Sequence, residues 1–240
     1  MKRIDASGLD FKALNEKLRQ SKADCVIEHC CGQRFLAAGM SQIKLTIEGV
    51  PGNALGAYLN GGSITVCGNA QDAVGDTMNE GEITVHGNIG DAAGYAMRGG
   101  AIFVKGNAGY RAGIHMKAYR DKVPTMVIGG RTGSFLGEYQ AGGVIVVLGL
   151  HDDGKPIVGN FPCTGLHGGK VFLRGKIDGV RFPKGVHVDA ASEAELNTIR
   201  PLLQAYCTKF GISEEALTGA PFFVVTPDSA NPFRQLYAAN

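Results

Sequence analysis

The sequence predicts a mainly β protein that folds as a parallel β-helix. Glycine makes up 36 of the 240 residues, about twice its usual share of ~7%, and most of these glycines fall within residues 43–175. Glycines that close short apolar segments recur there every 19 residues, at Gly49, Gly68, Gly87 and Gly106. A period near 19 with few helix-forming residues is too short for a helical repeat and matches one turn of a β-coil.

The strand of each coil shows the alternation expected when one face is buried. The repeat continues, with two insertions, through Gly130, Gly149 and Gly175. The residues four and two positions before each closing glycine are apolar and mostly β-branched. We therefore expect about seven coils around a shared interior. The inward pairs are Leu45/Ile47, Ile64/Val66, Ile83/Val85, Ile102/Val104, Met126/Ile128, Ile145/Val147 and Val171/Leu173.

A second glycine column, seven residues after the first, predicts a corner in each coil. Glycine suits corners that need a positive φ or a close backbone approach. In the last coil Cys163 stands in this column and departs from the repeat. Three residues after the corner comes one more inward position, which Met116 fills in one coil and Gln140 in the next. The corner glycines are Gly56, Gly75, Gly94, Gly113 and Gly137.

Two other coiled β folds fit the sequence less well. Left-handed hexapeptide helices repeat an apolar motif three times per coil, whereas each coil here has one such strand. Calcium-binding rolls need columns of aspartate. The column after the closing glycine holds Asn69, Asn88 and Asn107 instead, which predicts side-chain ladders or turns.

The N-terminal segment, 1–42, is predicted to cap the first coil. Residues 7–20 have the pattern of a helix, and Cys25–His29 with Arg34–Ala38 are interpreted as a hairpin. Covering the open end would protect a strand edge that otherwise favours aggregation.

The C-terminal segment, 181–240, is predicted to be a helical tail on the β-helix of residues 43–180. Ser192–Phe210 has the start and stop signals of a helix, which Pro201 is expected to kink or divide. The tail Pro221–Asn240 is apolar and then irregular, and we expect it to lie along the prism.

Composition excludes several classes of protein. Lysine and arginine number 24 against 22 acidic residues, a net charge of +2, which is too small to indicate nucleic-acid binding. No apolar run reaches the ~18 residues of a membrane span, and the N-terminus lacks the core of a signal peptide. Six scattered cysteines without a C-x-x-C pair favour a reduced compartment. We expect a cytoplasmic protein with no nucleic-acid or membrane partner.

Candidate reactive residues are few. Cys67 and His86 share an outward column on adjacent coils and could form a pair, although the same column is typical of a solvated edge. His151, Asp152 and Asp153 have metal-ligand chemistry but also the sequence of a plain turn. Motifs such as G-x-S-x-G, H-E-x-x-H and the P-loop do not occur. We therefore predict no catalytic, cofactor-binding or metal-binding residue in this chain.

Two surfaces are candidates for contact with a partner. One is the outward strand column, which is apolar at Phe103, Val127, Val146 and Phe172. An apolar column of this kind needs a cover, and either the C-terminal helix or a partner protein could supply it.

The second surface is the insertion at Lys117–Val123, which interrupts the 19-residue spacing and is not needed to complete a coil. It carries Lys117, Tyr119 and Arg120, a mixture suited to a polar protein interface. Loops of this kind often carry function. We hypothesise that it docks a partner chain; the alternative is a solvated bulge.

The repeat also resembles a known family. The pattern G-x-x-G-x-x-x-G at Gly87–Gly94 and Gly106–Gly113 resembles the GXGXG domain that ends the large subunit of glutamate synthase. The likeness runs from about residue 3 to residue 180, and more loosely to the tail, and it is strongest to the stand-alone form found in split, archaeal-type glutamate synthases. The segments that carry it are Ile47–Asn53, Gly68–Asp72, Gly94–Gly100 and Gly113–Lys117.

This resemblance implies a right-handed β-helix with a non-catalytic, structural role in a glutamate synthase complex, which converts glutamine and 2-oxoglutarate to two glutamates with a reductant. The partners would be an amidotransferase and a synthase chain that holds FMN and an iron–sulfur cluster, with no cofactor in this chain. A homo-oligomer is also compatible with the sequence. Two alternatives remain: a scaffold like the formylmethanofuran dehydrogenase chain that shares this glycine repeat, and an independent β-helix enzyme acting on a polymer.

Overall fold

The computed structural model describes residues 1–21, 24–151 and 154–228. Its helices are α1 (Phe11–Gln20), α2 (Glu193–Phe210) and α3 (Glu214–Thr218). Its strands are β1 (Lys2–Asp5), β2 (Cys25–Cys31), β3 (Ile43–Val50), β4 (Asn60–Val66), β5 (Glu80–Val85), β6 (Ala101–Val104), β7 (Thr125–Ile128), β8 (Ala141–Val147), β9 (Gly168–Arg174), β10 (Val186–Ala190) and β11 (Phe222–Pro227).

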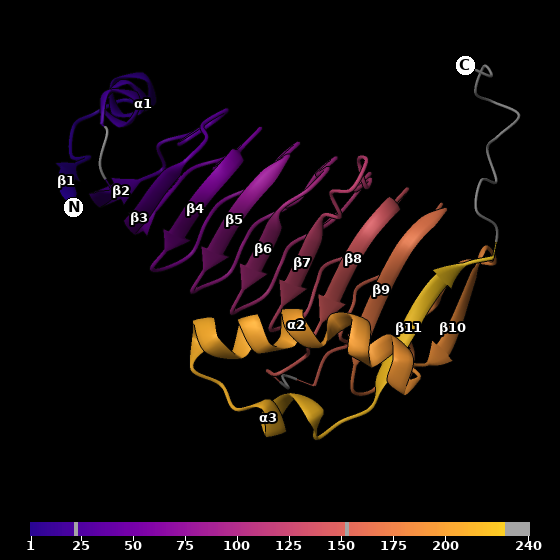
Figure 1. Cartoon of the computed structure of the whole chain (residues 1–240). Coiled ribbons are helices and arrows are strands. Elements are labelled where there is room, and N and C mark those ends of the chain that lie inside the picture. Colours follow the sequence, from indigo (N-terminus) through magenta and orange to yellow (C-terminus); the bar gives the residue numbers. More distant parts are fainter. Residues whose placement is uncertain (22–23, 152–153, 229–240) are drawn as a thin grey trace, which may run out of the picture.

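The strands form one sheet in the order β1 to β9, then β11 and β10. All neighbours from β1 to β9 are parallel, whereas β11 is antiparallel to both β9 and β10. The parallel strands stack as successive coils of a prism, with α2 crossing one face of the sheet and α1 at the N-terminal end (Figure 1). The protein is thus a parallel β-helix, as the sequence predicts.

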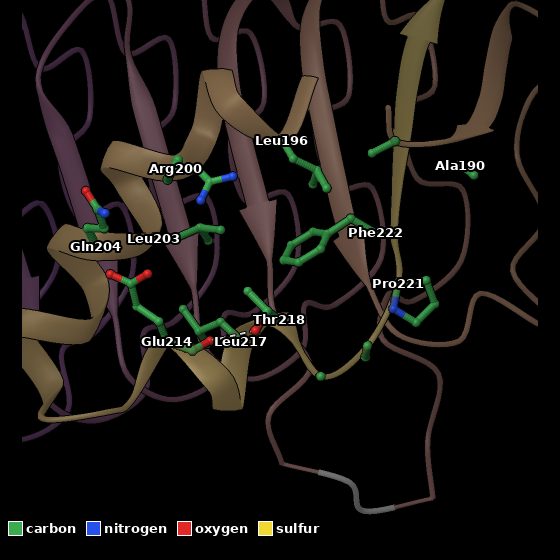
Figure 2. Close-up of a pocket in the computed structure, with 13 residues that line it drawn as sticks. Ala190, Leu196, Arg200, Leu203, Gln204, Glu214, Leu217, Thr218, Pro221 and Phe222 are labelled. Atoms are coloured by element: carbon green, nitrogen blue, oxygen red, sulfur yellow. Dashed lines mark hydrogen bonds between the residues drawn. The ribbon is translucent and has the colours of Figure 1, made fainter. Parts of the chain in front are cut away.

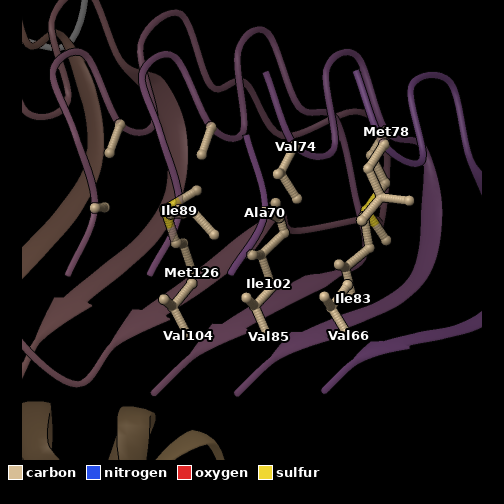
Figure 3. Packing of buried hydrophobic residues seen from close by; sticks show 14 of the residues in the cluster. Val66, Ala70, Val74, Met78, Ile83, Val85, Ile89, Ile102, Val104 and Met126 are labelled. Carbon is tan, nitrogen blue, oxygen red and sulfur yellow. The ribbon is translucent and has the colours of Figure 1, made fainter. Parts of the chain in front are cut away.

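The interior is filled by the predicted inward pairs, all of which are at most 1% exposed. Ile83 pairs in register with Ile64 on one side and Ile102 on the other, so that like side chains stack in columns along the prism (Figure 3). Burying one such side chain contributes about 1.5–3 kcal/mol. The repeated alternation therefore builds one continuous core.

Glycine is required at the corners because of both conformation and space. Gly113 has φ +69°, and a Cβ there would lie 2.3 Å from Cδ1 of Ile145. Cys163 adopts the same left-handed conformation, with φ +60°, and its side chain is fully buried. It precedes β9, the last parallel strand. No further parallel coil therefore supplies a side chain that would crowd this corner as Ile145 crowds Gly113. The repeat therefore holds at Cys163.

The asparagine column forms the predicted ladder. The Oδ1 of Asn69 accepts the backbone N–H of Asn88, and that of Asn88 accepts the N–H of Asn107, both at 2.8 Å. A second ladder, not predicted, runs from Asp72 through Asp91 to the N–H of Tyr110. Each of these side chains accepts a hydrogen bond from a backbone N–H of the next coil, and that donor would otherwise lack a partner at the bend.

The interpretation of the N-terminal segment as a hairpin is wrong. Strand β2 pairs in parallel with β1 and β3, and Arg34–Ala38 is a bend with left-handed residues at Phe35 and Ala37. This bend bonds to the next coil through the N–H of Phe35 and the carbonyl oxygen of Asn53 (2.8 Å). The segment is thus an extra coil whose strand-then-bend order mimics a hairpin in sequence.

The predicted N-terminal helix is present as α1 and covers the open end of the core. Its apolar residues Leu14 and Leu18 are at most 2% exposed and belong to the interior cluster. Asn15 joins the helix to the extra coil, because its Oδ1 accepts the N–H of Ala37 at 3.0 Å.

The C-terminal helix begins and ends where the sequence predicts. Ser192 is the N-cap and forms a capping box with Glu195, and these hydrogen bonds lower the pKa of the Glu195 carboxyl. Gly211 ends the helix in the left-handed conformation, and α2 runs unbroken through Pro201. The alternative in which Pro201 divides the helix is therefore wrong.

The predicted course of the tail is corrected in part. Phe222–Pro227 is strand β11, inserted between β9 and β10, rather than a segment lying along the prism. It adds Val225 to the interior cluster and so closes the C-terminal end. Residues 229–240 lie outside the described part of the chain.

Gln140 is an imperfection in the core. It is fully buried in the column that holds Met116 in the coil before. Its Nε2 donates to the carbonyl oxygens of Gly142 and Gly143, both at 3.2 Å, but its Oε1 has no partner among the described residues.

We expect Gln140→Met to stabilise the protein by about 1 kcal/mol, because a buried acceptor without a partner costs roughly that or more. Urea unfolding followed by circular dichroism measures the change. The matched variant Gln140→Glu keeps the shape, adds a buried charge and should destabilise. If Gln140→Met is the less stable protein, the two Nε2 bonds outweigh the unpartnered oxygen.

Candidate functional site

The candidate pair in the outward column, Cys67 and His86, does not form a reactive centre. Cys67 and His86 lie on neighbouring coils and are both exposed, but the His86 ring packs edge-on against Phe210 of α2, with centroids 5.2 Å apart. Desolvation, with a smaller contribution from Glu48, raises the pKa of the Cys67 thiol. A raised pKa keeps the thiol protonated and weakly nucleophilic.

The other candidate groups are not brought together either. Within the described ranges, no three His, Cys, Asp or Glu side chains converge as metal ligands. His151 is exposed, while Asp152 and Asp153 lie outside the described residues. Burial raises the pKa of Cys30 to about 11 and that of Cys163 to about 12.

The apolar outward column is covered by the chain itself. Phe103, Val127, Val146 and Phe172 are at most 2% exposed. They form a second hydrophobic cluster with one side of α2, which lies across these strands (Figure 1). Of the two covers considered from the sequence, the structure contains the C-terminal helix. These four residues are buried beneath it, which corrects the expectation that they could contact a partner. The α2 members of the cluster are Ile199, Leu203, Tyr206, Cys207 and Phe210.

Polar contacts hold α2 in place. Tyr206 is fully buried, and its hydroxyl donates to the carbonyl oxygen of Lys105 at 3.3 Å. Lys209 pairs with Glu82 at 2.6 Å and lies 4.9 Å from the Phe103 ring centroid. These bonds link the helix to the coils that it covers, so the helix is an integral layer of the fold.

A groove lies beside this helix, where α3 and the start of β11 meet α2 (Figure 2). It has a volume of about 500 Å³. Arg174 holds α3 in position by donating from Nε and Nη2 to the carbonyl oxygens of Leu217 (2.6 Å) and Ala216 (2.7 Å). The sequence did not predict this groove, because α3 is a single short turn. Its lining includes Leu196, Arg200, Leu203, Gln204, Glu214, Leu217 and Phe222.

The insertion at Lys117–Val123 is an ordered turn that presents exposed side chains. Tyr119 and Lys122 exchange backbone hydrogen bonds of 3.0 and 3.1 Å, and Lys122 Nζ pairs with Glu80 at 2.7 Å. Tyr119 is 50% exposed and Val123 52%. Arg120 stacks its guanidinium 5.2 Å from the Tyr119 ring centroid. Lys117 is exposed at the start of the turn.

An exposed aromatic surface on the bends was missed at the sequence level. The rings of His115 and Tyr139 stack 5.4 Å apart, as do those of Phe135 and Phe161. The two residues of each pair occupy equivalent positions of successive coils. Aligning the coils with their insertions would therefore have shown both aromatic pairs in the sequence. Tyr110, on the same bend as His115, is also exposed, as is Tyr58 on an earlier coil.

Comparisons with known proteins agree with this architecture. The sequence matches the GXGXG motif family over residues 15–219, and the chain belongs to that family. It is 42% identical to an uncharacterized protein of Methanocaldococcus jannaschii, over 98% of this chain and 95% of that protein.

A solved structure shares the fold. It is a chain of the formyltransferase/hydrolase complex from Methylorubrum extorquens, determined with methylofuran, with a TM-score of 0.60 and 22% identity. The likeness covers 91% of this chain and 88% of that chain. In the part of the chain described here, none of the helices combines the length and apolar character needed to cross a membrane.

Proposed function

We propose that this chain is a non-catalytic scaffold subunit of a multi-chain enzyme complex. The observation that carries the proposal is the ordered insertion at Lys117–Val123, which the coils do not need and which displays Tyr119 and Arg120 in a fixed turn. A rigid prism with one continuous core is suited to holding such a surface at a set position. The structurally similar chain belongs to a multi-chain complex, and this supports the same role.

The finer form of this proposal is a glutamate synthase subunit. It rests on the likeness of the glycine repeat to the GXGXG domain of that enzyme. In this form, an amidotransferase chain releases ammonia from glutamine, and a synthase chain carries FMN and the iron–sulfur cluster. This chain then supplies position and contact, with no cofactor of its own.

A second candidate is a scaffold in a formyltransferase/hydrolase type of complex. It is favoured by the structural likeness over 91% of this chain. Both candidates use the chain in the same way and differ in the partners.

Affinity purification of the tagged full chain from its native host, followed by mass spectrometry, separates the candidates. Recovery of an amidotransferase and a flavoprotein supports the first, and recovery of formyltransferase or hydrolase chains supports the second. Ammonia release from glutamine, or stoichiometric flavin absorbance, in the purified chain alone would contradict the scaffold role.

The docking role of the insertion is tested by replacing Lys117, Tyr119 and Arg120 together with alanine. We expect weaker co-purification with the partner and a change in stability within about 0.5 kcal/mol, because surface substitutions away from the core cost little. Thermal melting and quantitative pull-down measure the two effects. Alanine at Lys12, Lys17 and Arg19 on α1 is the matched control. Equal recovery of the partner by both variants would show that docking uses another surface.

A further inference from the structure

Strand β10 ends the sheet and leaves one backbone edge open. Within the described residues it pairs with β11 alone. Ala191 donates its N–H to Phe222, and Gly185 accepts from Asp228, in the same antiparallel register. Hydrogen-bonded pairs alternate along an antiparallel ladder, so odd-numbered residues of β10 bond to β11. Even-numbered residues therefore direct their N–H and C=O groups away from the sheet.

The two faces of β10 differ in chemistry. Val186 and Val188 are half-buried and pack against the interior cluster. Val188 lies in the row that continues through Val225 to Val171. His187 and Asp189 are exposed on the opposite face. Among the residues that the structure describes, the outer edge of β10 thus combines an apolar side, an ionisable side and backbone groups without partners.

We propose that β10 pairs antiparallel with β10 of a second copy of this chain, about a two-fold axis at Val188. In this register Val188 lies opposite its own counterpart, and Val186 lies opposite Ala190 of the second copy. All three are even-numbered, so every backbone group that faces outward meets a group that can bond to it. The valine row would then continue across the interface and bury side chains that are half-exposed in one copy.

Charge complementarity supports this register. His187 falls opposite Asp189 of the second copy, and symmetry repeats the pair. It is a non-hydrogen-bonded pair, in which opposing Cα atoms are only about 4.5 Å apart. A protonated histidine opposite a carboxylate makes an oppositely charged pair, which favours association. Sliding by two residues would place His187 opposite His187, or Asp189 opposite Asp189. Sliding by one would exchange the two faces.

The other end of the sheet is protected against such pairing. Strand β1 carries Lys2, Arg3 and Asp5 in four residues. Arg3 pairs with Glu28, and Asp5 lies 3.1 Å from His29. Charged side chains are a common means of blocking strand edges. The contrast favours β10, whose two ionisable side chains complement each other in the second copy.

Sedimentation of the purified full chain over a wide range of concentration tests the proposal. We expect a reversible change from the monomer of 25.2 kDa to a dimer of twice that mass. Val188→Pro removes an N–H that β11 does not use, and proline is tolerated on such an edge, so it should abolish the dimer with the fold retained. Val188→Thr keeps the N–H and the branched shape and is the control that stays dimeric.

A charge exchange tests the register. His187→Asp places carboxylates opposite each other and should weaken the dimer about tenfold. The double variant His187→Asp/Asp189→His restores opposite pairs and should recover most of the affinity. A chain that stays monomeric, a dimer that survives Val188→Pro, or a double variant without recovery would each overturn the proposal. The proposal would also be overturned if Val188→Pro abolished the binding of a different protein, because that protein would then be the partner that pairs with β10.

Discussion

Replacing Ile83 with aspartate is expected to cost about 4 kcal/mol or more of unfolding free energy, because it buries a charge without a partner. Ile83 is fully buried and stacks between Ile64 and Ile102 at the centre of the prism (Figure 3). No polar group of the column could compensate the carboxylate. A typical domain has only about 5–15 kcal/mol in total, so urea unfolding should show a large fall in the midpoint.

A matched substitution separates this effect from the presence of a charge in a strand. Thr65 lies in β4 with its side chain on the outer face and half exposed. Thr65→Asp should change the unfolding free energy by well under half as much. If Ile83→Asp unfolds at the same urea concentration as the unmodified protein, the assignment of inward and outward positions is wrong.

Replacing Gly113 with alanine is expected to cost about 3 kcal/mol, the second-largest effect. The left-handed φ of +69° costs a non-glycine residue about 1–2 kcal/mol. The new Cβ would lie 2.3 Å from Cδ1 of Ile145, and overpacking a closed core costs about 1–3 kcal/mol more. Ile145 is fully buried, so its side chain has little room to move.

Two variants divide these contributions, both measured by the same urea unfolding. Gly8 has φ +71° but nothing within 4 Å of an added Cβ, so Gly8→Ala should show the conformational cost alone. The double variant Gly113→Ala/Ile145→Val removes the crowding Cδ1 and should recover part of the loss. Equal costs for Gly8→Ala and Gly113→Ala would mean that the corners are less crowded than the structure indicates.

The repeats were predictable because their information is local. A strand, a corner and an inward residue recur in each coil, so every column is seen many times in one sequence. That redundancy carried the register across both insertions and through Cys163, where the usual glycine is missing. The same comparison of columns could have found His115 and Tyr139, whose rings stack at equivalent positions.

The errors fell where the chain has no repeat. Cys25–Cys31 and Arg34–Ala38 have the composition of a hairpin, but the second segment turns along the bend and bonds to the next coil. A returning hairpin strand would bond to β2, whereas this segment has left-handed residues at Phe35 and Ala37 and bonds to the next coil. Local sequence does not specify that neighbour when only one unit is present.

The two candidate docking surfaces also differ in how far the sequence alone determined them. The insertion at Lys117–Val123 was visible as a break in spacing, and the structure shows it as an ordered turn with Tyr119 exposed. The apolar column at Phe103 and Phe172 was visible too, but two covers were consistent with it. Only the path of the chain after β10 shows that α2 is the cover.

The sequence by itself determined the β-helix, its coil length, its inward columns and its corners, because alternation and glycine placement act within each coil. The tertiary structure alone decided three features at the ends: the extra N-terminal coil, the cover of the outer face by α2, and the insertion of β11 between β9 and β10. These depend on contacts between segments far apart in the chain and present once each. Long-range packing selected among arrangements that local propensity left equivalent, and in the described part of the chain it leaves β10 at the edge of the sheet.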